Sequence, residues 1–205
     1  MRRSEAFVTL DRLGVPAVTT AEAAAALELS PGSASKMLGR LADDGLMTRL
    51  GHGEWAVGQV RDPFALAATL TQPYPSYISL ASALRAHGMI TQVPRQIQVV
   101  SLRRPGVVTA AGNEYRIHQV APPLFGGYAL GQGGFLLATP EKAIFDTAYL
   151  EVTGRVSGRG RPEIEIPVDW NADAARGWAE RIASASLRRR TCERVESIIA
   201  GMAHG

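Results

Sequence analysis

The side chains with the clearest chemical pattern in this chain lie in one segment, SPGSASKMLGRLADDGL, from Ser30 to Leu46. Placed at about 100° per residue around a helix, the apolar residues Ala34, Leu38 and Leu41 gather on one side, which predicts a core-facing surface. The opposite side holds Gly32, Ser33, Lys36 and Arg40, with Gly39 and Ser35 at one flank. Small residues let a helix backbone approach base edges in a DNA major groove, and Lys and Arg can bind phosphates or guanine. The pattern favours a helix that reads DNA.

Start and stop signals predict the helices that must position this face. Thr19 to Glu22 has the spacing of a capping box and begins a short alanine-rich helix. Ser30 and Pro31 can cap and begin the next helix, which Gly45 ends. A first helix is expected from Ser4 to Leu13. Two helices joined by a turn of three or four residues have the spacing of a helix-turn-helix.

A hairpin is expected directly after these helices. Residues 46–50 and 54–57 read as two strands around the turn Gly51-His52-Gly53. Three helices followed by a hairpin predict a winged helix-turn-helix over residues 1–60. Arg49 and His52 of the hairpin, together with Arg2 and Arg3 as a flexible arm, are candidates for further DNA contacts.

Two features of this region argue against contact of DNA with the whole length of the helix. Residues 1–60 carry six Lys and Arg against seven Asp and Glu, so the region is not basic overall. Asp43 and Asp44 lie at the carboxyl end of the helix and would repel phosphate. We therefore expect only the first two turns to enter the groove. The alternative is a winged helix used for protein contact, with Lys36 and Arg40 as solvated charges.

The rest of the chain is expected to form a second, mixed domain. Prolines mark residues 61–75 as a linker or connecting helix, and residues 76–205 as the second domain. Helices are predicted at 77–87, 140–150 and, in two pieces, 172–202; strands are predicted at 97–102, 115–120, 134–137 and 164–168. The predicted fold class is α+β.

Neither a cofactor nor a metal site is expected. His52, His87, His118 and His204 share no spacing with carboxylates that would suit a metal. The glycines of FGGYALGQGGF, residues 125–135, lack the Lys and Ser or Thr of a phosphate loop and favour a turn-rich hairpin. Cys192 is expected to be a packed helix cysteine, and the alternative is that the four arginines near it in the sequence lower the pKa of its thiol.

The composition bears on location. A single cysteine permits no internal disulfide. No signal-peptide pattern and no apolar run of the roughly 18 residues that a membrane span needs is present. We expect a cytoplasmic protein that does not bind membranes.

Three segments resemble a known family: YISLASALRAHGMITQVPRQIQVVS, YRIHQVAPPLFGGY and LATPEKAIFDTAYL. They are similar to the AbiEi-type antitoxins of abortive-infection toxin-antitoxin systems, whose members also begin with a winged helix-turn-helix. The resemblance implies an antitoxin whose N-terminal domain represses its own operon by binding inverted repeats in operator DNA. It also implies at least two copies on DNA and a C-terminal antitoxin domain that counters a toxin with a nucleotidyltransferase-like fold.

The most specific part of the resemblance is Thr139-Pro140-Glu141-Lys142-Ala143 with Asp146. Thr139 can cap a helix, Pro140 can begin it, and Glu141 suits its first turn. We interpret this motif as helix initiation with apolar packing rather than as a catalytic group. The arginines outside the N-terminal domain that are candidates for a partner surface are Arg103, Arg104, Arg155, Arg159 and Arg161. Solvated loop charges are the alternative for them.

Two other functions stay open at this point. The chain could be a protein-interaction module that neutralises the toxin by direct binding without binding DNA. It could also be an enzyme that modifies the toxin, although the sequence offers no recognisable nucleophile or nucleotide loop. We expect a protein that is not an enzyme.

Overall fold

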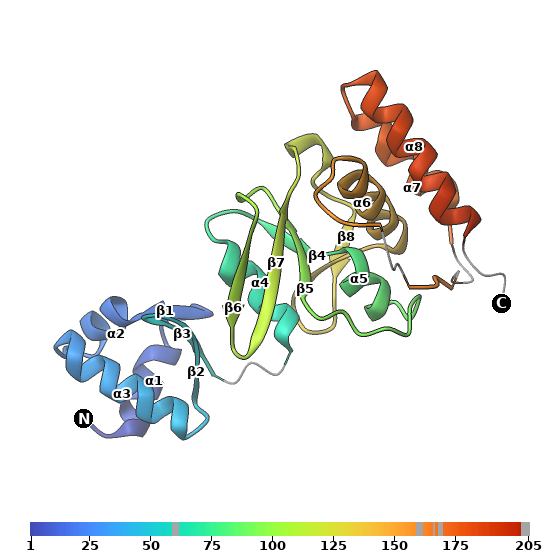
Figure 1. Cartoon of the computed structure of the whole chain (residues 1–205). Coiled ribbons are helices and arrows are strands. Elements are labelled where there is room, and N and C mark those ends of the chain that lie inside the picture. Colours follow the sequence, from blue (N-terminus) through green and yellow to red (C-terminus); the bar gives the residue numbers. More distant parts are fainter. Residues whose placement is uncertain (59–61, 159–161, 166, 168–169, 202–205) are drawn as a thin grey trace.

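The chain folds as a mixed α+β protein in a computed structural model that describes residues 1–58, 62–158, 162–165, 167 and 170–201. Helices and a small sheet occupy the N-terminal end, and a larger sheet with helices on both of its faces forms the remainder (Figure 1). Arg61, Arg159, Arg161 and His204 lie outside the described residues. Within those residues, no helix has the length and apolar character needed to cross a membrane.

The N-terminal part consists of three helices and three short strands. In chain order these are α1 (Arg3–Asp11), β1 (Ala17–Thr19), α2 (Thr20–Ala26), α3 (Pro31–Asp43), β2 (Met47–Gly51) and β3 (Glu54–Val57). Their buried side chains form one core cluster around Leu10, Leu27, Leu38, Leu41 and Trp55. The predicted α2 and α3 are confirmed at their starts, because Thr19 and Ser30 both accept a backbone N–H as capping residues.

The small sheet has one strand more than the predicted hairpin. β3 lies between β2 and β1 and pairs antiparallel with both. The strand β1 was not predicted, since three residues after Pro16 carry no alternating pattern of their own. The first helix also ends earlier than predicted, at Asp11, and Leu13 is 44% exposed rather than part of the core.

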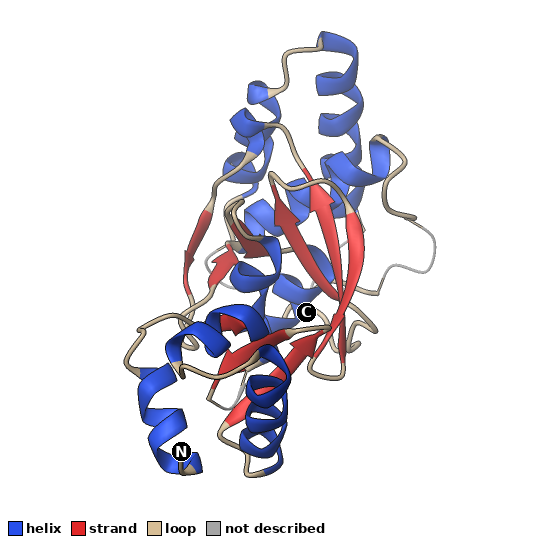
Figure 2. Ribbon diagram, turned by 90° about the vertical axis from the view of Figure 1, so that its left-hand side faces the viewer, coloured by secondary structure: helices blue, strands red, loops and turns tan. Residues whose placement is uncertain are grey.

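The larger sheet is mixed, with the strand order β6-β7-β5-β4-β9-β8. Figure 2 shows the strands of the protein in red and the helices in blue. Its strands are β4 (Ser76–Ile78), β5 (Ile97–Ser101), β6 (Gly106–Ala110), β7 (Asn113–Gln119), β8 (Tyr128–Leu130) and β9 (Leu136–Ala138). The pairs β5–β7 and β4–β9 are parallel, and the others are antiparallel. The hairpin predicted at residues 125–135 is present as β8 and β9, but its second strand begins only at Leu136, just beyond the predicted range.

Alternating residues of this sheet face two different cores. Val99 and Ile117 pack with α4 (Leu66–Thr71), which follows a short 3-10 turn at Pro63–Ala65. Val100 lies on the opposite face, in the core formed with α5 (Leu80–Ala86) and α6 (Pro140–Val152). Because side chains alternate along a strand, β7 sends Arg116 and His118 toward this second face.

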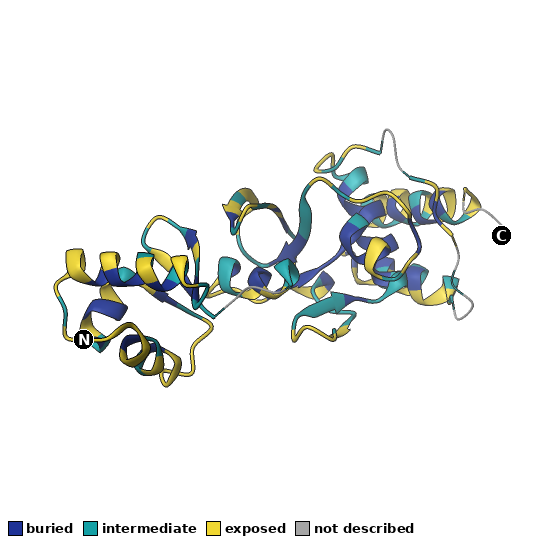
Figure 3. Cartoon of the chain, turned by 90° about the horizontal axis from the view of Figure 1, so that it is seen from below, coloured by how far each residue is buried: buried dark blue, intermediate teal, exposed yellow. Residues whose placement is uncertain are grey.

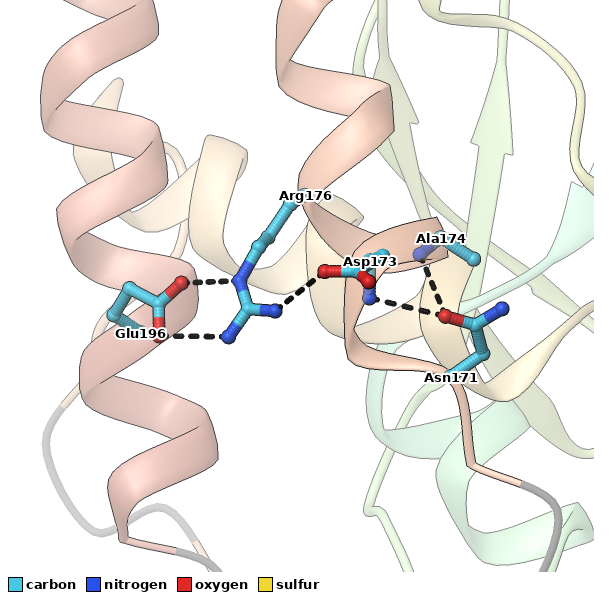
Figure 4. Close-up of polar contacts among 5 residues, drawn as sticks. All are labelled: Asn171, Asp173, Ala174, Arg176 and Glu196. Atoms are coloured by element: carbon cyan, nitrogen blue, oxygen red, sulfur yellow. Dashed lines mark hydrogen bonds and ion pairs between the residues drawn. The ribbon is translucent and has the colours of Figure 1, made fainter.

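The C-terminal helices complete the layer over α6. They are α7 (Ala172–Gly177), the 3-10 turn Trp178–Arg181 and α8 (Ala185–Ala200). Arg176 joins α7 to α8, since its Nε donates to Glu196 at 2.5 Å and its Nη1 donates to Asp173 at 2.7 Å (Figure 4). Asn171 caps α7 by accepting the backbone N–H groups of Asp173 and Ala174. The predicted division of 172–202 into two helical pieces is confirmed.

Three predictions for the second half need correction. The segment predicted as a helix from Tyr77 begins instead as β4, and the helix starts only at Leu80. The strand β6 was not predicted. At residues 164–168, only Glu165 makes a bridge, through its N–H to the carbonyl of Met89, and Ile166 and Val168 lie outside the described residues.

A third buried cluster joins the two halves of the chain. Leu50 of β2 and Ala56 of β3 pack with residues of α4 and of the larger sheet, including Leu66 and Ala67. Buried residues accordingly continue from the N-terminal end into the larger sheet (Figure 3).

Candidate nucleic-acid interface

The helix α3 has two opposite faces of different composition. Ala34, Leu38 and Leu41 are fully buried, as predicted, and Met37 joins them at the edge of the core. The residues of the opposite face are exposed: Gly32, Ser33, Ser35, Lys36 and Arg40. The outer sides of the N-terminal helices are exposed over most of their length (Figure 3). The predicted face is therefore accessible to a partner.

The amino end of α3 is held by a serine pair. Ser30 accepts the backbone N–H of Ser33 at 3.3 Å, and its hydroxyl also donates to the Ser33 hydroxyl at 3.0 Å. Pro31 occupies the first helical position, where no backbone N–H is needed. The Ser33 hydroxyl consequently has a defined position at the first turn, with its own hydrogen still able to point outward.

Two glycines on the exposed face of α3 are not required by the fold. A Cβ at Gly32 or Gly39 would meet no other atom within 4 Å. Glycine inside a helix is unfavourable by roughly 0.5–1 kcal/mol relative to alanine. Gly32, Lys36 and Gly39 lie along one line of the helix, because their spacings are four and three residues. These glycines leave the backbone of α3 open to close approach from outside.

The turn between α2 and α3 is fixed by backbone hydrogen bonds. Glu28 adopts a left-handed conformation with φ of 53°. The N–H of Glu28 donates to the carbonyl of Ala25, and the N–H of Leu29 donates to that of Ala24. This is a Schellman ending of α2, which usually places glycine at the left-handed position. The four residues of the turn therefore set the angle at which α3 leaves α2.

The N-terminal arginines do not form the predicted flexible arm. Arg3 is the first residue of α1, and the backbone N–H of Arg2 donates to Glu5 at 2.9 Å as the cap of that helix. The Arg3 guanidinium binds both carboxylate oxygens of Asp44, at 2.8 and 2.7 Å. This pair attaches α1 to the carboxyl end of α3, and it neutralises one of the two aspartates that were expected to repel phosphate.

The hairpin β2–β3 presents its two predicted side chains to solvent. Arg49 and His52 are both exposed, with His52 in the turn itself. The Arg49 guanidinium lies 5.5 Å from the centre of the Trp55 ring, which is a cation–π geometry. The Trp55 indole N–H donates to Thr20 Oγ1 at 3.0 Å, so the hairpin is anchored to the start of α2.

The motif of residues 139–143 with Asp146 contains a buried ion pair that the sequence did not predict. Thr139 caps α6 as expected, by accepting the N–H of Lys142. Lys142 Nζ binds Asp146 one turn later, and both side chains are fully buried. Asp146 also accepts hydrogen bonds from the Tyr77 hydroxyl at 3.0 Å and the Ser79 hydroxyl at 2.8 Å. The motif therefore joins α6 to β4 as well as initiating the helix.

Burial dominates the electrostatics of this pair. It lowers the pKa of the Lys142 ammonium and raises that of the Asp146 carboxyl, while their mutual attraction opposes both changes. The Lys142 Nζ also lies 4.5 Å from the centre of the Trp178 ring and 4.8 Å from that of Phe145. With neither charge accessible to solvent, the pair is a structural element. The signal in the sequence was the spacing of Lys142 and Asp146 within an apolar run.

The candidate partner arginines do not form one patch among the residues that the structure describes. Arg103 donates to the carbonyl of Leu70 at 2.8 Å, on the α4 side of the sheet. Arg155 donates to the carbonyl of Gln119, on the side of α6. Arg104 is exposed, and Arg159 and Arg161 lie outside the described residues. Arg103 and Arg155 therefore lie on opposite faces of the sheet.

The remaining chemical candidates are placed as follows. Burial and the charge of Glu180 raise the pKa of the Cys192 thiol, which contradicts the alternative of a lowered value. His87 Nε2 lies 2.8 Å from the carbonyl of Ala138 in β9. Across the described ranges, no three His, Cys, Asp or Glu side chains gather closely enough to hold a metal ion.

The comparisons with known proteins do not identify a family. No model of a known protein family matches the chain, and no curated protein is similar to it at a significant level.

Proposed function

We propose that this protein is a DNA-binding antitoxin that represses its own operon and counteracts a nucleotidyltransferase-like toxin. In this proposal residues 1–58 act as a winged helix-turn-helix. The helix α3 enters the major groove with Ser33, Ser35, Lys36 and Arg40, and the hairpin β2–β3 contacts the backbone through Arg49 and His52. Two copies bind an inverted repeat, with half-sites about one helical turn apart.

The observation that carries the DNA-binding part is the composition of the exposed face of α3. Two glycines there have open space above them, although neither is needed for packing. A helix that only faced water would gain stability from alanine at those positions. The glycines are explained if the helix backbone approaches a partner surface closely, because they have no side chain to prevent it. Lys36 and Arg40 place positive charge beside them. The Arg3–Asp44 ion pair removes one repulsive charge from the same region.

The antitoxin part rests on the resemblance of residues 77–150 to AbiEi-type antitoxins. The described structure adds that Lys142 and Asp146, two residues of the motif most specific to that resemblance, are fully buried, which favours a role in folding over chemistry on a substrate. We therefore propose neutralisation of the toxin through binding or repression rather than through enzymatic modification.

The DNA-binding proposal is tested by gel shift with duplex DNA from upstream of the gene. Lys36→Ala combined with Arg40→Ala should weaken specific binding at least tenfold. If both cations contact phosphate, the slope of log K against log salt should fall by about 1.8, because each phosphate contributes about 0.9. The matched control is Arg12→Ala combined with Arg95→Ala, which removes the same charge at exposed positions away from α3.

The control decides between local contact and general electrostatics. Equal binding losses in the two double variants would contradict contact by the α3 face, as would unchanged binding in the first. In a toxin co-expression assay, the Lys36→Ala, Arg40→Ala variant should still restore growth when it is produced from a separate promoter. This outcome would locate neutralisation outside α3. Normal neutralisation by a chain that never binds its upstream DNA would favour the protein-interaction module instead.

A further inference from the structure

A cavity of about 440 Å³ opens on the face of the larger sheet that is covered by α5 and α6, far along the chain from α3. Its apolar wall is made by Leu80, Ala81 and Leu84 of α5 and by Val156. Its polar wall is made by Gln98 of β5 and Arg116 of β7, with Arg155 at the rim after α6. A volume of this size is in the range of small-molecule sites, which combine apolar walls with a few convergent polar groups.

The charges around this cavity are mainly positive. Arg116 and Arg155 are both exposed and line it. Among the described lining residues the carboxylate is Glu151, which is held by Arg194 at 2.5 Å and is therefore compensated. Glu114 precedes Arg116 by two residues on the same strand face, but it binds Gln96 and is not part of the lining. The described hydrogen bonds of the two lining arginines go to neutral acceptors, the Gln96 side chain for Arg116 and the carbonyl of Gln119 for Arg155.

The polar floor of the cavity is held in place by hydrogen bonds that are partly buried or exposed. Gln98 Oε1 lies 2.7 Å from Nε2 of His118, and the backbone N–H of Gln98 donates to Ser82 of α5 at 2.9 Å. Arg116 Nε donates to Gln96 at 2.7 Å, which fixes the stem of its guanidinium and leaves its terminal nitrogens for another acceptor. Burial, together with the charges of Arg116 and Arg155, lowers the pKa of His118 to about 4. Both guanidinium charges therefore act on the buried imidazole of His118.

The rim of the cavity is also a built structure. Arg155 is fixed by its bond to the carbonyl of Gln119. Gly158 packs closely on the Arg194–Glu151 pair, so that a Cβ there would require the Arg194 guanidinium to shift. At the opposite wall Leu80 has a φ of 50°, a left-handed conformation that is costly for leucine. Strained backbone of this kind is concentrated at ligand sites.

We infer that this cavity binds a small organic anion, with a carboxylate or phosphate on Arg116 and Arg155 and an apolar body against Leu80, Ala81 and Leu84. Guanidinium groups match the geometry of both oxyanions through paired hydrogen bonds. The apolar wall requires a ligand with a carbon skeleton, so inorganic phosphate alone should bind weakly. A DNA backbone does not suit the site, because the polar groups lie in a concave pocket rather than along a track.

The inference is tested by NMR on the full chain with methyl-labelled leucine. The probes are phenyl phosphate and benzoate, with phenol and benzamide as their uncharged partners. The methyl signals of Leu80 and Leu84, assigned with Leu80→Met and Leu84→Met variants, should shift saturably with at least one anionic probe. The uncharged partners and inorganic phosphate should bind at least tenfold more weakly. Phenyl phosphate and benzoate distinguish a phosphate from a carboxylate ligand.

Variants then assign the affinity to the arginines. Arg116→Gln and Arg155→Gln should each weaken binding of the anionic probe at least tenfold, whereas the exposed control Arg104→Gln should leave it unchanged. Ala81→Leu fills the apolar wall and should abolish binding while both charges remain. Failure of both anions to shift the Leu80 and Leu84 methyls at 10 mM would overturn the inference. Equal affinity for charged and uncharged probes would do so as well. A saturable shift with duplex DNA would instead identify a nucleic-acid surface. These readouts do not depend on the upstream DNA, so the inference and the proposed function can fail separately.

Discussion

Replacing Lys142 by methionine should destabilise the protein strongly. The substitution keeps most of the side-chain volume and the contacts with Trp178, but it leaves the fully buried carboxylate of Asp146 without its cation. Removing one partner of a buried ion pair costs about 3–5 kcal/mol. For a protein of this length, each kcal/mol lowers the melting temperature by about 2–4 °C, so we expect a decrease of roughly 10 °C at pH 8.

The structure offers a matched control for this measurement. Arg189 and Glu193 form an ion pair with the same four-residue spacing on α8, but both side chains are largely exposed. Arg189→Met should therefore leave the urea unfolding midpoint unchanged within error, because most exposed pairs contribute little. A second variant, Lys142→Met with Asp146→Asn, removes the buried charge but keeps an acceptor for Tyr77 and Ser79. It should be more stable than Lys142→Met alone.

The pH dependence of Lys142→Met tests the same reasoning by another route. Burial raises the pKa of Asp146 in the folded chain, and loss of the neighbouring ammonium raises it further. A group with a raised folded-state pKa contributes stability that is fully present below its unfolded-state pKa and is lost as pH rises through the folded value. The difference in unfolding free energy between the variant and the unchanged protein should accordingly be smaller at pH 5.5 than at pH 8. A pH-independent difference, or one as small as that of Arg189→Met, would refute the assignment of a buried charged pair.

Three further outcomes are expected. The His118 pKa of about 4 lies below its unfolded-state value of 6.5, so the unfolded chain binds a proton more tightly. The free energy of unfolding should therefore fall by about 2 kcal/mol between pH 7.5 and pH 5. His118→Gln should remove this pH dependence in urea titrations, and an unchanged dependence of the unfolding free energy on pH would contradict it. Gly39→Ala should raise the free energy of unfolding by up to about 1 kcal/mol, and with it the melting temperature, since a Cβ there meets nothing within 4 Å. A lower melting temperature would mean that the position is packed. Glu28→Gly should stabilise the α2–α3 turn by about 1 kcal/mol because φ is 53° there, and calorimetry that finds a loss would show that the Glu28 side chain matters more than its backbone.

The elements that could be predicted are those with local start and stop signals. Ser30 and Pro31 define the beginning of α3, and Thr139 and Pro140 do the same for α6. Capping depends on residues three positions apart, so a single sequence contains the whole signal. The exposed face of α3 follows from the same helical periodicity, which explains why Gly32, Ser33, Lys36 and Arg40 are exposed, while Gly39 at the flank is half-buried.

The elements that could not be predicted depend on distant partners. The strands β1 and β4 have three residues each and exist because a neighbouring strand pairs with them. Tyr77 was assigned to a helix because its apolar spacing continues into α5, and the left-handed Leu80 that separates the two elements has no signature in its residue type. The buried pair of Lys142 and Asp146 likewise needs Tyr77 and Ser79, which are almost seventy residues earlier.

The hairpin β2–β3 is covered on both sides at its base. Trp55 belongs to the core of the three helices, while its neighbour Ala56 and Leu50 of β2 belong to the cluster shared with α4. A hairpin that is packed on both sides at its base, and whose strand β3 also pairs with β1, has little freedom to hinge, so the turn at His52 is the part that can adjust to the shape of what it touches. A rotation of α3 relative to the larger sheet would have to separate one of these two packed layers. The orientation of α3 is thus set by the whole chain.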